Sequence, residues 1–348
     1  MALNAGIRPA IFAQRGQNSG EAMSIAAILH EFTPSSVGIK IEEVPDLSPG
    51  EGEVLLDMLA APINPADLNI LEGKYGELPD LPSRVGNEGS GRVVAVGESV
   101  SRLQVGDLVV VLQRGTWGNQ MVVKETNAWK VPSDLDPAQA AMLAVNPPTA
   151  LLMLQTVKLQ PGEWVVQNAA NSAVGRSVIQ IARSKGLRTL NVVRRPELID
   201  ELKALGADVV VTEDTDLRKE ISTFCGKDKP RLGLNAVGGA SALNLANSLA
   251  AGGQLVTYGA MGRQPLKIPN GLLIFKGLQF TGFWLSSWKK TASEEEIASV
   301  FAELSALAEK GELLIAVDTT FPLKDLHTAL EKASGESRSG KVMLDLAS

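Results

Sequence analysis

Hydrophobic positions in the first third of the chain fall in short alternating or continuous runs, which is the pattern of β-strands. Gly, Pro and Asp separate the runs, as turn residues do. The runs are SIAAILHEF, GEVLLDMLAA, GRVVAVG, GDLVVVL and NQMVVKE, all between residues 24 and 125. They predict a compact, mostly antiparallel β domain that reaches about residue 131.

The spacing of hydrophobic positions becomes helical near residue 137. Residues 136–157 read DPAQAAMLAVNPPTALLMLQTV, with a Pro-Pro break in the middle. From residue 163, strand-like and helix-like segments alternate, beginning with EWVVQNA and AVGRSVIQIARSKG and ending with QLVTYG. Serial βαβ units predict a doubly wound parallel sheet with helices on both faces. The chain is therefore expected to be α/β, with a Rossmann unit after the β domain.

The C-terminal tail is too short for a domain of its own. After LQFTGFWL the pattern predicts a long helix near 293–310 and a final strand–helix–strand over 313–345. We expect this tail to return to the β domain. The predicted domains are thus 24–150 together with 290–348, and a nucleotide-binding domain over 151–289.

Composition narrows the class of protein. Apolar residues make up 45% and charged residues 21%, the net charge is −6, and no apolar run is long enough to span a membrane. This excludes membrane insertion and gives no basic footprint for nucleic acid. Residues 1–23 are expected to be a flexible extension. Residues 1–22 carry two arginines and no acid before Glu21, which fits a mitochondrial transit peptide or a bacterial extension that precedes the original start at Met23. The weak basicity favours the second and a cytoplasmic protein, with the mitochondrial matrix as the alternative.

The turn NAANSAVG, residues 168–175, follows the first strand of the alternation. A dinucleotide fingerprint has Gly-x-Gly-x-x-Gly, but Ala170 and Ser172 hold the first two positions and only Gly175 remains. The helix that starts there, near Ala173 and Val174, can still bind a pyrophosphate through its first N–H groups, and Asn171 and Ser172 can cap it or donate to phosphate. A plain capped turn explains the loop equally well. The surrounding βαβ units favour the cofactor.

The second strand of the alternation ends in Arg194 and Arg195. NAD-binding units usually place an acid there for the ribose 2′-hydroxyl, whereas the first acid here is Glu197, beyond Pro196. Guanidinium groups bind a 2′-phosphate through charge-assisted hydrogen bonds, and a carboxylate would repel it. The pair predicts NADPH rather than NADH. The alternative is that both arginines lie in solvent.

The segment VGNEGSGRVVAVG (85–97) lies in the β domain, and this domain is split into two segments of sequence around the Rossmann unit. In these features the chain resembles the medium-chain dehydrogenase/reductase superfamily, whose β domain is GroES-like and catalytic. Zinc-dependent members carry Gly-His-Glu where this chain has Gly86-Asn87-Glu88. The chain has one cysteine and two histidines, too few for a catalytic or structural zinc. We therefore expect no metal.

The resemblance narrows to the mitochondrial-type 2-enoyl thioester reductases, from about Ile25 to the C-terminus. It rests on INPADLNILEGKYGELPDLPSRVGNEG, QNAANSAVG, LRTLNVVRRPE, YGAMGRQP and LLIFKGLQFTGFWLSSWKK. The chain departs from the family in having a bare Arg-Arg pair where Arg-Asp-Arg is common. The resemblance implies NADPH-dependent reduction of the C2=C3 bond of trans-2-enoyl-CoA or enoyl-ACP, in fatty acid synthesis.

The resemblance also implies site residues. Tyr75, in the Gly-flanked loop EGKYGELP, falls on the catalytic tyrosine, which gives the enolate a proton or a hydrogen bond; the alternative is a surface tyrosine packed on Pro79 or Pro82. Residues after buried strands should border the cofactor. By this rule, or by the resemblance, the further cofactor-binding residues are Asn146, Tyr258, Gly259, Ala260, Met261, Phe283, Trp284, Leu285 and Lys341. Core packing competes for Met261. Lys289 and Lys290 fit a solvated pair better than a phosphate site.

Members of the superfamily commonly form dimers through edge strands of their nucleotide sheets, and LQFTGFWL is a candidate edge, so we expect a homodimer. Two other functions stay open. One is a zinc-free NADPH quinone reductase of the same superfamily. The other is a non-catalytic NADPH-binding protein.

Overall fold

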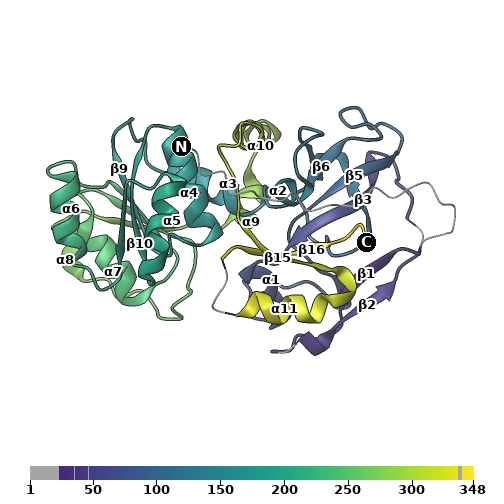
Figure 1. Cartoon of the computed structure of the whole chain (residues 1–348), viewed down its shortest axis with the longest axis horizontal. Helices are drawn as coiled ribbons and strands as arrows, with labels where there is room; N and C mark the ends of the chain where they lie inside the picture. The colour runs from purple at the N-terminus through teal and green to yellow at the C-terminus, as the bar shows by residue number, and fades with distance from the viewer. Residues whose placement is uncertain (1–22, 35, 46, 336–338) are drawn as a thin grey trace, which may run out of the picture. The chain divides into compact units, whose positions relative to one another are not determined.

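The computed structural model describes residues 23–34, 36–45, 47–335 and 339–348, and the chain forms two compact units (Figure 1). Unit 1 combines residues 1–144 with 316–348, and unit 2 is 145–315. The boundaries therefore lie before 150 and after 289. Residues 290–315 belong to unit 2 because α10 (Glu294–Glu309) packs on α3 (Asn146–Leu154) and because the Gln180 side chain bonds the Leu314 backbone at 3.0 and 2.9 Å. The predicted extension, 1–23, lies outside the described residues except for Met23.

Unit 1 is a mostly antiparallel β structure, as predicted. A seven-stranded sheet has the order β15-β16-β3-β5-β6-β8, with β7 paired to β3, and a second sheet has the order β2-β1-β4. Only the β15–β16 pair is parallel among the pairs of described strands in this unit. The strands are β1 (Ile25–Leu29), β2 (Ile39–Glu43), β3 (Glu53–Pro62), β4 (Ser83–Arg84), β5 (Gly89–Val96), β6 (Leu108–Val111), β7 (Gln120–Lys124), β8 (Ala128–Lys130), β15 (Val317–Pro322) and β16 (Lys341–Asp345).

The C-terminal tail completes this sheet. β16 pairs with β3, where Leu344 lies opposite Ala61. The helix before it, α11 (Leu326–Ser334), packs Leu326 and Leu330 into the same core as Leu56 of β3. The tail thus returns to the β domain over residues 316–348, whereas residues 290–315, which were predicted to return with it, belong to unit 2. α2 (Pro137–Ala141) also belongs to unit 1 and packs on β3 and β5.

Helix α1 (Pro65–Leu71) was not predicted, because it is short and follows a strand directly. Asn64 and Asp67 form a capping box at its start, and Pro65 occupies the first helical position, which suits a residue without an N–H. The loop after α1 carries Tyr75. This tyrosine is partly buried and packs against the core of unit 1.

Unit 2 is a Rossmann fold, as predicted. Its sheet has the order β11-β10-β9-β12-β13-β14, and every pair is parallel. Counted along the chain this is the order 3-2-1-4-5-6 of dinucleotide-binding sheets, with the switch point between β9 and β12. The strands are β9 (Trp164–Gln167), β10 (Arg188–Val193), β11 (Val209–Thr212), β12 (Leu232–Asn235), β13 (Gln254–Thr257) and β14 (Gln279–Gly282).

Helices cover both faces of this sheet. Alternate residues of one strand point to opposite faces: Val192 packs in a cluster with Leu245 of α7, and Val193 in another with Leu202 of α5. The helices are α4 (Ala173–Ser184), α5 (Ile199–Leu205), α6 (Leu217–Cys225), α7 (Gly239–Ser248), α8 (Asn270–Ile274) and α9 (Leu285–Thr291). The short helices α8 and α9 were not predicted.

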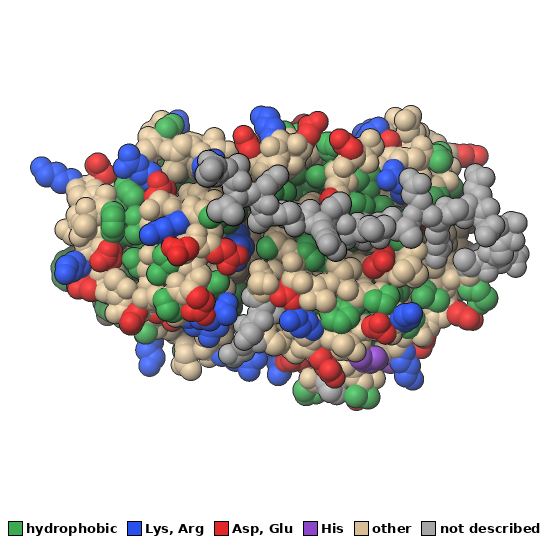
Figure 2. Space-filling view, viewed as in Figure 1, with side chains coloured by type: hydrophobic (Ala, Val, Ile, Leu, Met, Phe, Trp, Pro, Cys, Tyr) green, Lys and Arg blue, Asp and Glu red, His purple; other side chains and the backbone are tan. Residues whose placement is uncertain are grey.

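The described surface carries both signs of charge. On the face in Figure 2, Lys and Arg side chains are interspersed with Asp and Glu over both units. Among the helices of the described ranges, none combines the length and the hydropathy that a membrane crossing requires.

Candidate active site

The turn between β9 and α4 is tightly packed. Ser172 is the N-cap of α4, and its hydroxyl accepts a hydrogen bond from the Gly175 N–H at 3.1 Å. Gly175 lies directly on Ala170, whose backbone carbonyl oxygen would be 2.6 Å from a Cβ at position 175. A side chain here would push the helix start away from the strand. The turn therefore has the small residues and the partly exposed helix start that a pyrophosphate needs. The close contact with Ala170 also explains why the last glycine of the fingerprint remains.

A buried amide pair fixes this turn at the switch point. Asn168, which directly follows β9, accepts a hydrogen bond from the Ala236 N–H at 2.7 Å and donates to Asn235 Oδ1 at 2.8 Å. Asn235 ends β12, and its Oδ1 also accepts from the Gly238 N–H at 3.0 Å. The loops after the two strands are thus joined by side-chain hydrogen bonds. Sequence reasoning missed both asparagines, although each directly follows or ends a buried strand.

The end of β10 presents the arginine pair. Arg194 is exposed and forms no ion pair within the described ranges, whereas Arg195 is half-buried, with Nε 3.8 Å from Glu197 Oε1. An ion pair this long and exposed contributes little. Both guanidinium groups are therefore available to an anion at the carboxyl end of β10. Ala170 N–H donates to the Val192 carbonyl at 3.2 Å, so the pyrophosphate turn and the end of β10 adjoin.

Tyr258 follows β13 at the same edge of the sheet. Its hydroxyl is buried, which raises the pKa of the phenol well above its usual value, an effect that the nearby Ser172 hydroxyl partly offsets. The hydroxyl has no well-aligned hydrogen-bond partner among the described residues. A ligand atom at the Ser172 turn would supply one. Tyr258 and the pyrophosphate turn are thus brought together.

The other predicted cofactor residues of unit 2 follow strands or begin helices. A Cβ on Gly259 would lie 3.0 Å from the Ala236 carbonyl oxygen, so the loop 258–261 packs on the end of β12. Ala260 and Met261 are exposed, so Met261 is not a core residue. Phe283 is partly buried, Trp284 is exposed, and Leu285 is buried at the start of α9. Asn146 is buried at the start of α3, which packs on α4.

Tyr75 and Lys341 lie in unit 1. Lys341, at the start of β16, is buried, and its Nζ donates to Asn64 Oδ1. Asn64 Nδ2 in turn donates to Glu88 Oε1 at 2.8 Å. Lys341 is therefore part of a buried polar cluster with Asn64, Asp67 and Glu88. Its cofactor contact stays a prediction, as does the catalytic role of Tyr75.

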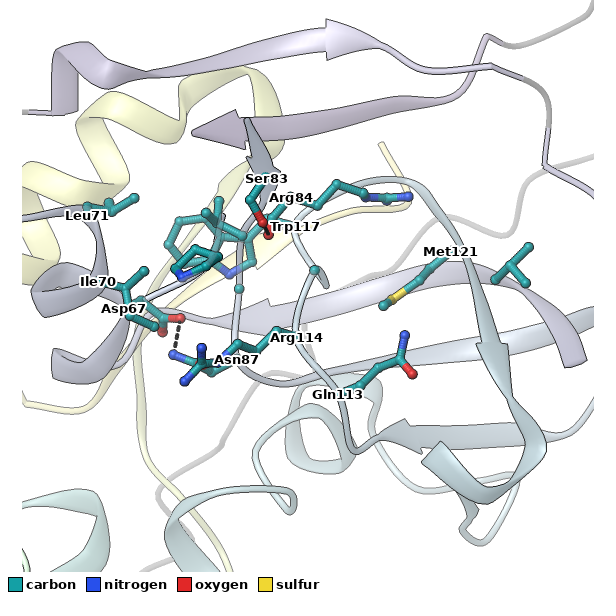
Figure 3. A pocket seen from close by; sticks show the side chains of 15 residues that line it. Asp67, Ile70, Leu71, Ser83, Arg84, Asn87, Gln113, Arg114, Trp117 and Met121 are labelled. Carbon is teal, nitrogen blue, oxygen red and sulfur yellow. Dashed lines mark hydrogen bonds between the residues drawn. The ribbon is translucent and has the colours of Figure 1, made fainter. Parts of the chain in front are cut away.

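Asn87 extends this cluster toward the tyrosine loop. Its Nδ2 donates to Asp67 Oδ1 at 2.7 Å, and its Oδ1 accepts from Arg114 Nε at 3.1 Å (Figure 3). Burial raises the pKa of Asp67 from 3.8 to about 7; Glu88 adds to this and Lys341 opposes it. Asp67, Asn87 and Arg114 line a cavity of about 320 Å³, whose apolar lining includes Trp117 and Met121. From the sequence, Asn87 was identified only as the residue that replaces a zinc-binding histidine, and Arg114 was not identified.

The cysteine and histidine side chains of this chain do not fit a zinc site. Cys225 is buried in α6, where burial raises the pKa of its thiol to about 11, which opposes the thiolate that zinc binds. His30 pairs with Glu42 and His327 with Ser36, both in unit 1. The described residues form no group of three His, Cys, Asp or Glu side chains suited to a metal.

Comparisons with known proteins agree with this geometry. The alcohol dehydrogenase GroES-like domain matches residues 50–133, and the zinc-binding dehydrogenase domain matches residues 173–305. The human mitochondrial enoyl-[acyl-carrier-protein] reductase is 44% identical over 94% of this chain and 90% of its own, and the protein of that name from Rattus norvegicus is 48% identical over 82% and 79%.

Solved structures give the same picture. The complex of Etr1p with NADP and crotonyl-CoA has a TM-score of 0.82, with 30% identity, over 93% of this chain and 99% of that one. A quinone oxidoreductase from Pseudomonas syringae has a TM-score of 0.81 at 26% identity, over 93% and 100%. The identity to the enoyl reductases and its coverage decide between the two groups: this chain belongs to the mitochondrial enoyl-[acyl-carrier-protein] reductase family of the medium-chain dehydrogenase/reductase superfamily.

Proposed function

We propose that the protein uses NADPH to reduce the C2=C3 bond of trans-2-enoyl thioesters, giving saturated acyl thioesters for fatty acid synthesis. The proposal rests on the arginine pair at the end of β10, which supports NADPH as the cofactor. The family of enoyl reductases to which the chain belongs supports the reaction. The turn at 168–175 takes the pyrophosphate and the two guanidinium groups take the 2′-phosphate. When bound, the reduced nicotinamide supplies a hydride to Cβ of the substrate.

Unit 1 supplies the remaining chemistry in this proposal. As hydride arrives at Cβ, negative charge develops on the thioester oxygen, and the Tyr75 phenol donates a hydrogen bond or a proton to the enolate. The enolate takes up a proton at Cα, which completes the saturated thioester. The other residues proposed to contact the cofactor are those assigned from the sequence, with Lys341 from unit 1 among them. Tyr75 is the only tyrosine of this unit, because the chain has two and Tyr258 lies in unit 2.

A direct assay tests the function. NADPH oxidation is followed with crotonyl-CoA and, separately, with a naphthoquinone. Faster turnover with crotonyl-CoA is expected. Preference for the quinone would identify the second candidate, which the likeness to the Pseudomonas syringae quinone oxidoreductase keeps open. If the protein binds NADPH but turns over neither substrate, the remaining hypothesis is a non-catalytic NADPH-binding protein.

Tyr75→Phe tests the catalytic assignment. The variant keeps the ring but lacks the hydroxyl, so kcat should fall by about 100-fold or more while the Kd for NADPH stays unchanged. Tyr75→Phe with undiminished kcat would remove the tyrosine from the mechanism.

We also propose a homodimer joined through β14. This strand ends the six-stranded sheet, and three of its four residues are exposed, which leaves backbone groups ready to pair. The N–H groups of Gln279 and Phe283 donate toward β13, so the alternate residue Gly282 faces the free edge. Gly282→Pro would remove an N–H from that edge, so sedimentation of the variant should show monomers. A dimeric variant would place the contact elsewhere.

The compartment and the physiological acyl carrier belong to this proposal too. The relatives in the comparison are named mitochondrial, which corresponds to the alternative drawn from residues 1–22; cytoplasmic placement is the other. A fluorescent protein fused behind residues 1–22 and expressed in a eukaryotic cell separates them. Crotonyl-CoA and crotonyl-ACP compared at equal concentration give the preferred carrier.

A further inference from the structure

Arg114 contacts the tyrosine loop at two points. Its guanidinium carbon lies over the Tyr75 ring, 5.7 Å from the ring centre. Its Nη1 also donates to the Glu77 carbonyl oxygen at 3.2 Å. A cation over an aromatic face is attracted by the ring quadrupole, and the hydrogen bond restrains the backbone two residues further on. One side chain thus restrains both the ring and the loop that carries it.

Arg114 is itself held in place by a series of hydrogen bonds. Asn87 Oδ1 accepts from Arg114 Nε at 3.1 Å, while Asn87 Nδ2 donates to Asp67 Oδ1 at 2.7 Å. The second oxygen of Asp67 accepts from the Asn64 N–H, at 2.7 Å, within the capping box of α1. The amide of Asn87 therefore has one workable orientation, with its nitrogen toward the carboxylate and its oxygen toward the arginine. Figure 3 shows Asn87 bonded to Asp67, with Arg114 beside it.

The series begins in a rigid part of the fold. Asp67 is buried, and Asn64 also binds Lys341 of β16 and Glu88, the residue before β5. The tyrosine loop, by contrast, alternates exposed and partly buried residues over 72–80. Arg114 therefore connects a loop with few buried side chains to a cluster that the sheet fixes.

We propose that Arg114 is a positioning residue for Tyr75, held by Asn87 and Asp67 so that the phenol keeps the orientation that catalysis requires. At the place of the histidine of zinc-dependent relatives, Asn87 orients an arginine. The kinetic part of this inference rests on the proposed function, whereas the structural part concerns the ring of Tyr75 alone.

The structural part is tested by ¹⁹F NMR of the full-length protein labelled with fluorotyrosine. The chain has two tyrosines, so two resonances are expected, and Tyr75→Phe assigns them. Arg114→Gln and Asn87→Ala should both shift and narrow the Tyr75 resonance and leave that of Tyr258 in place. Asn87 has no hydrogen bond to the tyrosine loop among those described, and its one hydrogen bond toward that loop goes to Arg114. In the Arg114→Gln background, Asn87→Ala should therefore leave the Tyr75 resonance unchanged, which separates this route from one through Asp67. The matched control is Arg92→Gln, since Arg92 also donates to a backbone carbonyl, that of Gly106, at 2.8 Å.

The kinetic part is tested by a double-mutant cycle. Arg114→Gln alone should lower kcat by about 10- to 100-fold, the cost of a misplaced catalytic group, with the Kd for NADPH unchanged. In the Tyr75→Phe background the same substitution should lower kcat by less than about twofold, because no hydroxyl remains to be positioned.

Two results would overturn the proposal: an unmoved Tyr75 resonance in Arg114→Gln, or full additivity of the two losses in kcat. A wild-type protein that does not reduce crotonyl-CoA would defeat the proposed function instead. In that case the NMR comparison would still decide whether Arg114 holds Tyr75.

Discussion

Gly175 and Ala170 approach so closely that a Cβ on Gly175 would lie 2.6 Å from the Ala170 carbonyl oxygen. Gly175→Ala should therefore displace the start of α4 and destabilise the protein by about 1–3 kcal/mol, as overpacking does. The Kd for NADPH should rise with it. Urea unfolding and fluorescence titration measure the two effects. Gly271→Ala in α8 is the control, since its Cβ would meet only Phe275, at 3.7 Å; equal losses in both variants would contradict the argument.

The arginine pair predicts a selective change in cofactor affinity. Replacing Arg194 and Arg195 by serine removes charge-assisted hydrogen bonds, each worth about 1.5–3 kcal/mol. The Kd for NADPH should rise about 100-fold or more, while that for NADH stays within about twofold. Arg188→Ser at the opposite end of β10 serves as control, because that arginine stacks on Trp164. A parallel loss of both cofactors would show that the pair supports the fold rather than the 2′-phosphate.

Asp67 predicts how stability depends on pH. Burial raises its pKa from 3.8 to about 7, so between these values the folded state holds a proton that the unfolded state releases. The free energy of unfolding should therefore fall as pH rises from about 4 to 7, by up to about 1.4 kcal/mol per pH unit from this group. Asp67→Asn does not titrate, so relative to it the wild type should lose stability over this range. Urea unfolding at pH 5, 6 and 7 measures the difference.

The substitution Asp67→Asn also adds a constant cost, because its NH₂ group faces an N–H donor. Only the slope against pH bears on the prediction. Asp80→Asn, at an exposed carboxylate of the same unit, should run parallel to the wild type. A parallel curve for Asp67→Asn as well would show that the carboxyl is ionised throughout.

The hydrogen bond between Asn168 and Asn235 at the switch point predicts that an isosteric substitution lowers the stability of the protein. Asn168→Asp places a second oxygen where the amide nitrogen donates to Asn235 Oδ1 and to Ser241. The buried repulsion should cost about 2–4 kcal/mol of unfolding free energy and weaken NADPH binding. Asn244→Asp, on the exposed side of α7, should change neither. Thermal unfolding with and without NADPH checks both variants, and a wild-type midpoint for Asn168→Asp would refute the prediction.

Local patterns predicted the elements that have a clear period. The alternation around β3 and the buried runs of β9 to β13 were sufficient for both sheets, because side-chain period follows directly from backbone geometry. Arg194 and Arg195 could be proposed as cofactor contacts because they directly follow a strand of the nucleotide sheet, and such strand ends commonly border the ligand. The short helix α1 was missed, although Asn64-Pro65-Ala66-Asp67 carries a capping-box signal that a closer search would find.

The contacts around Tyr75 could not be predicted in this way. Arg114 comes from a different loop, and Lys341 meets Asn64 across 277 positions of sequence. No periodic pattern in the sequence relates residues this far apart. Lys341 and Asn64 come together only because β16 pairs with β3. The polar cluster of unit 1 is a product of sheet topology, so it becomes visible only in the folded chain.

The insertion of unit 2 within the sequence of unit 1 has a consequence for biosynthesis. A ribosome delivers the whole Rossmann sheet before it delivers β16, so the nucleotide unit can fold while the β unit still lacks the strand that joins β15 to β3. Until Lys341 emerges, Asn64 and its acidic neighbours have no buried cation beside them. The β unit is therefore completed only after the nucleotide unit, and a nascent chain that stops before β16 would keep the nucleotide fold beside a β sheet that lacks one of its interior strands.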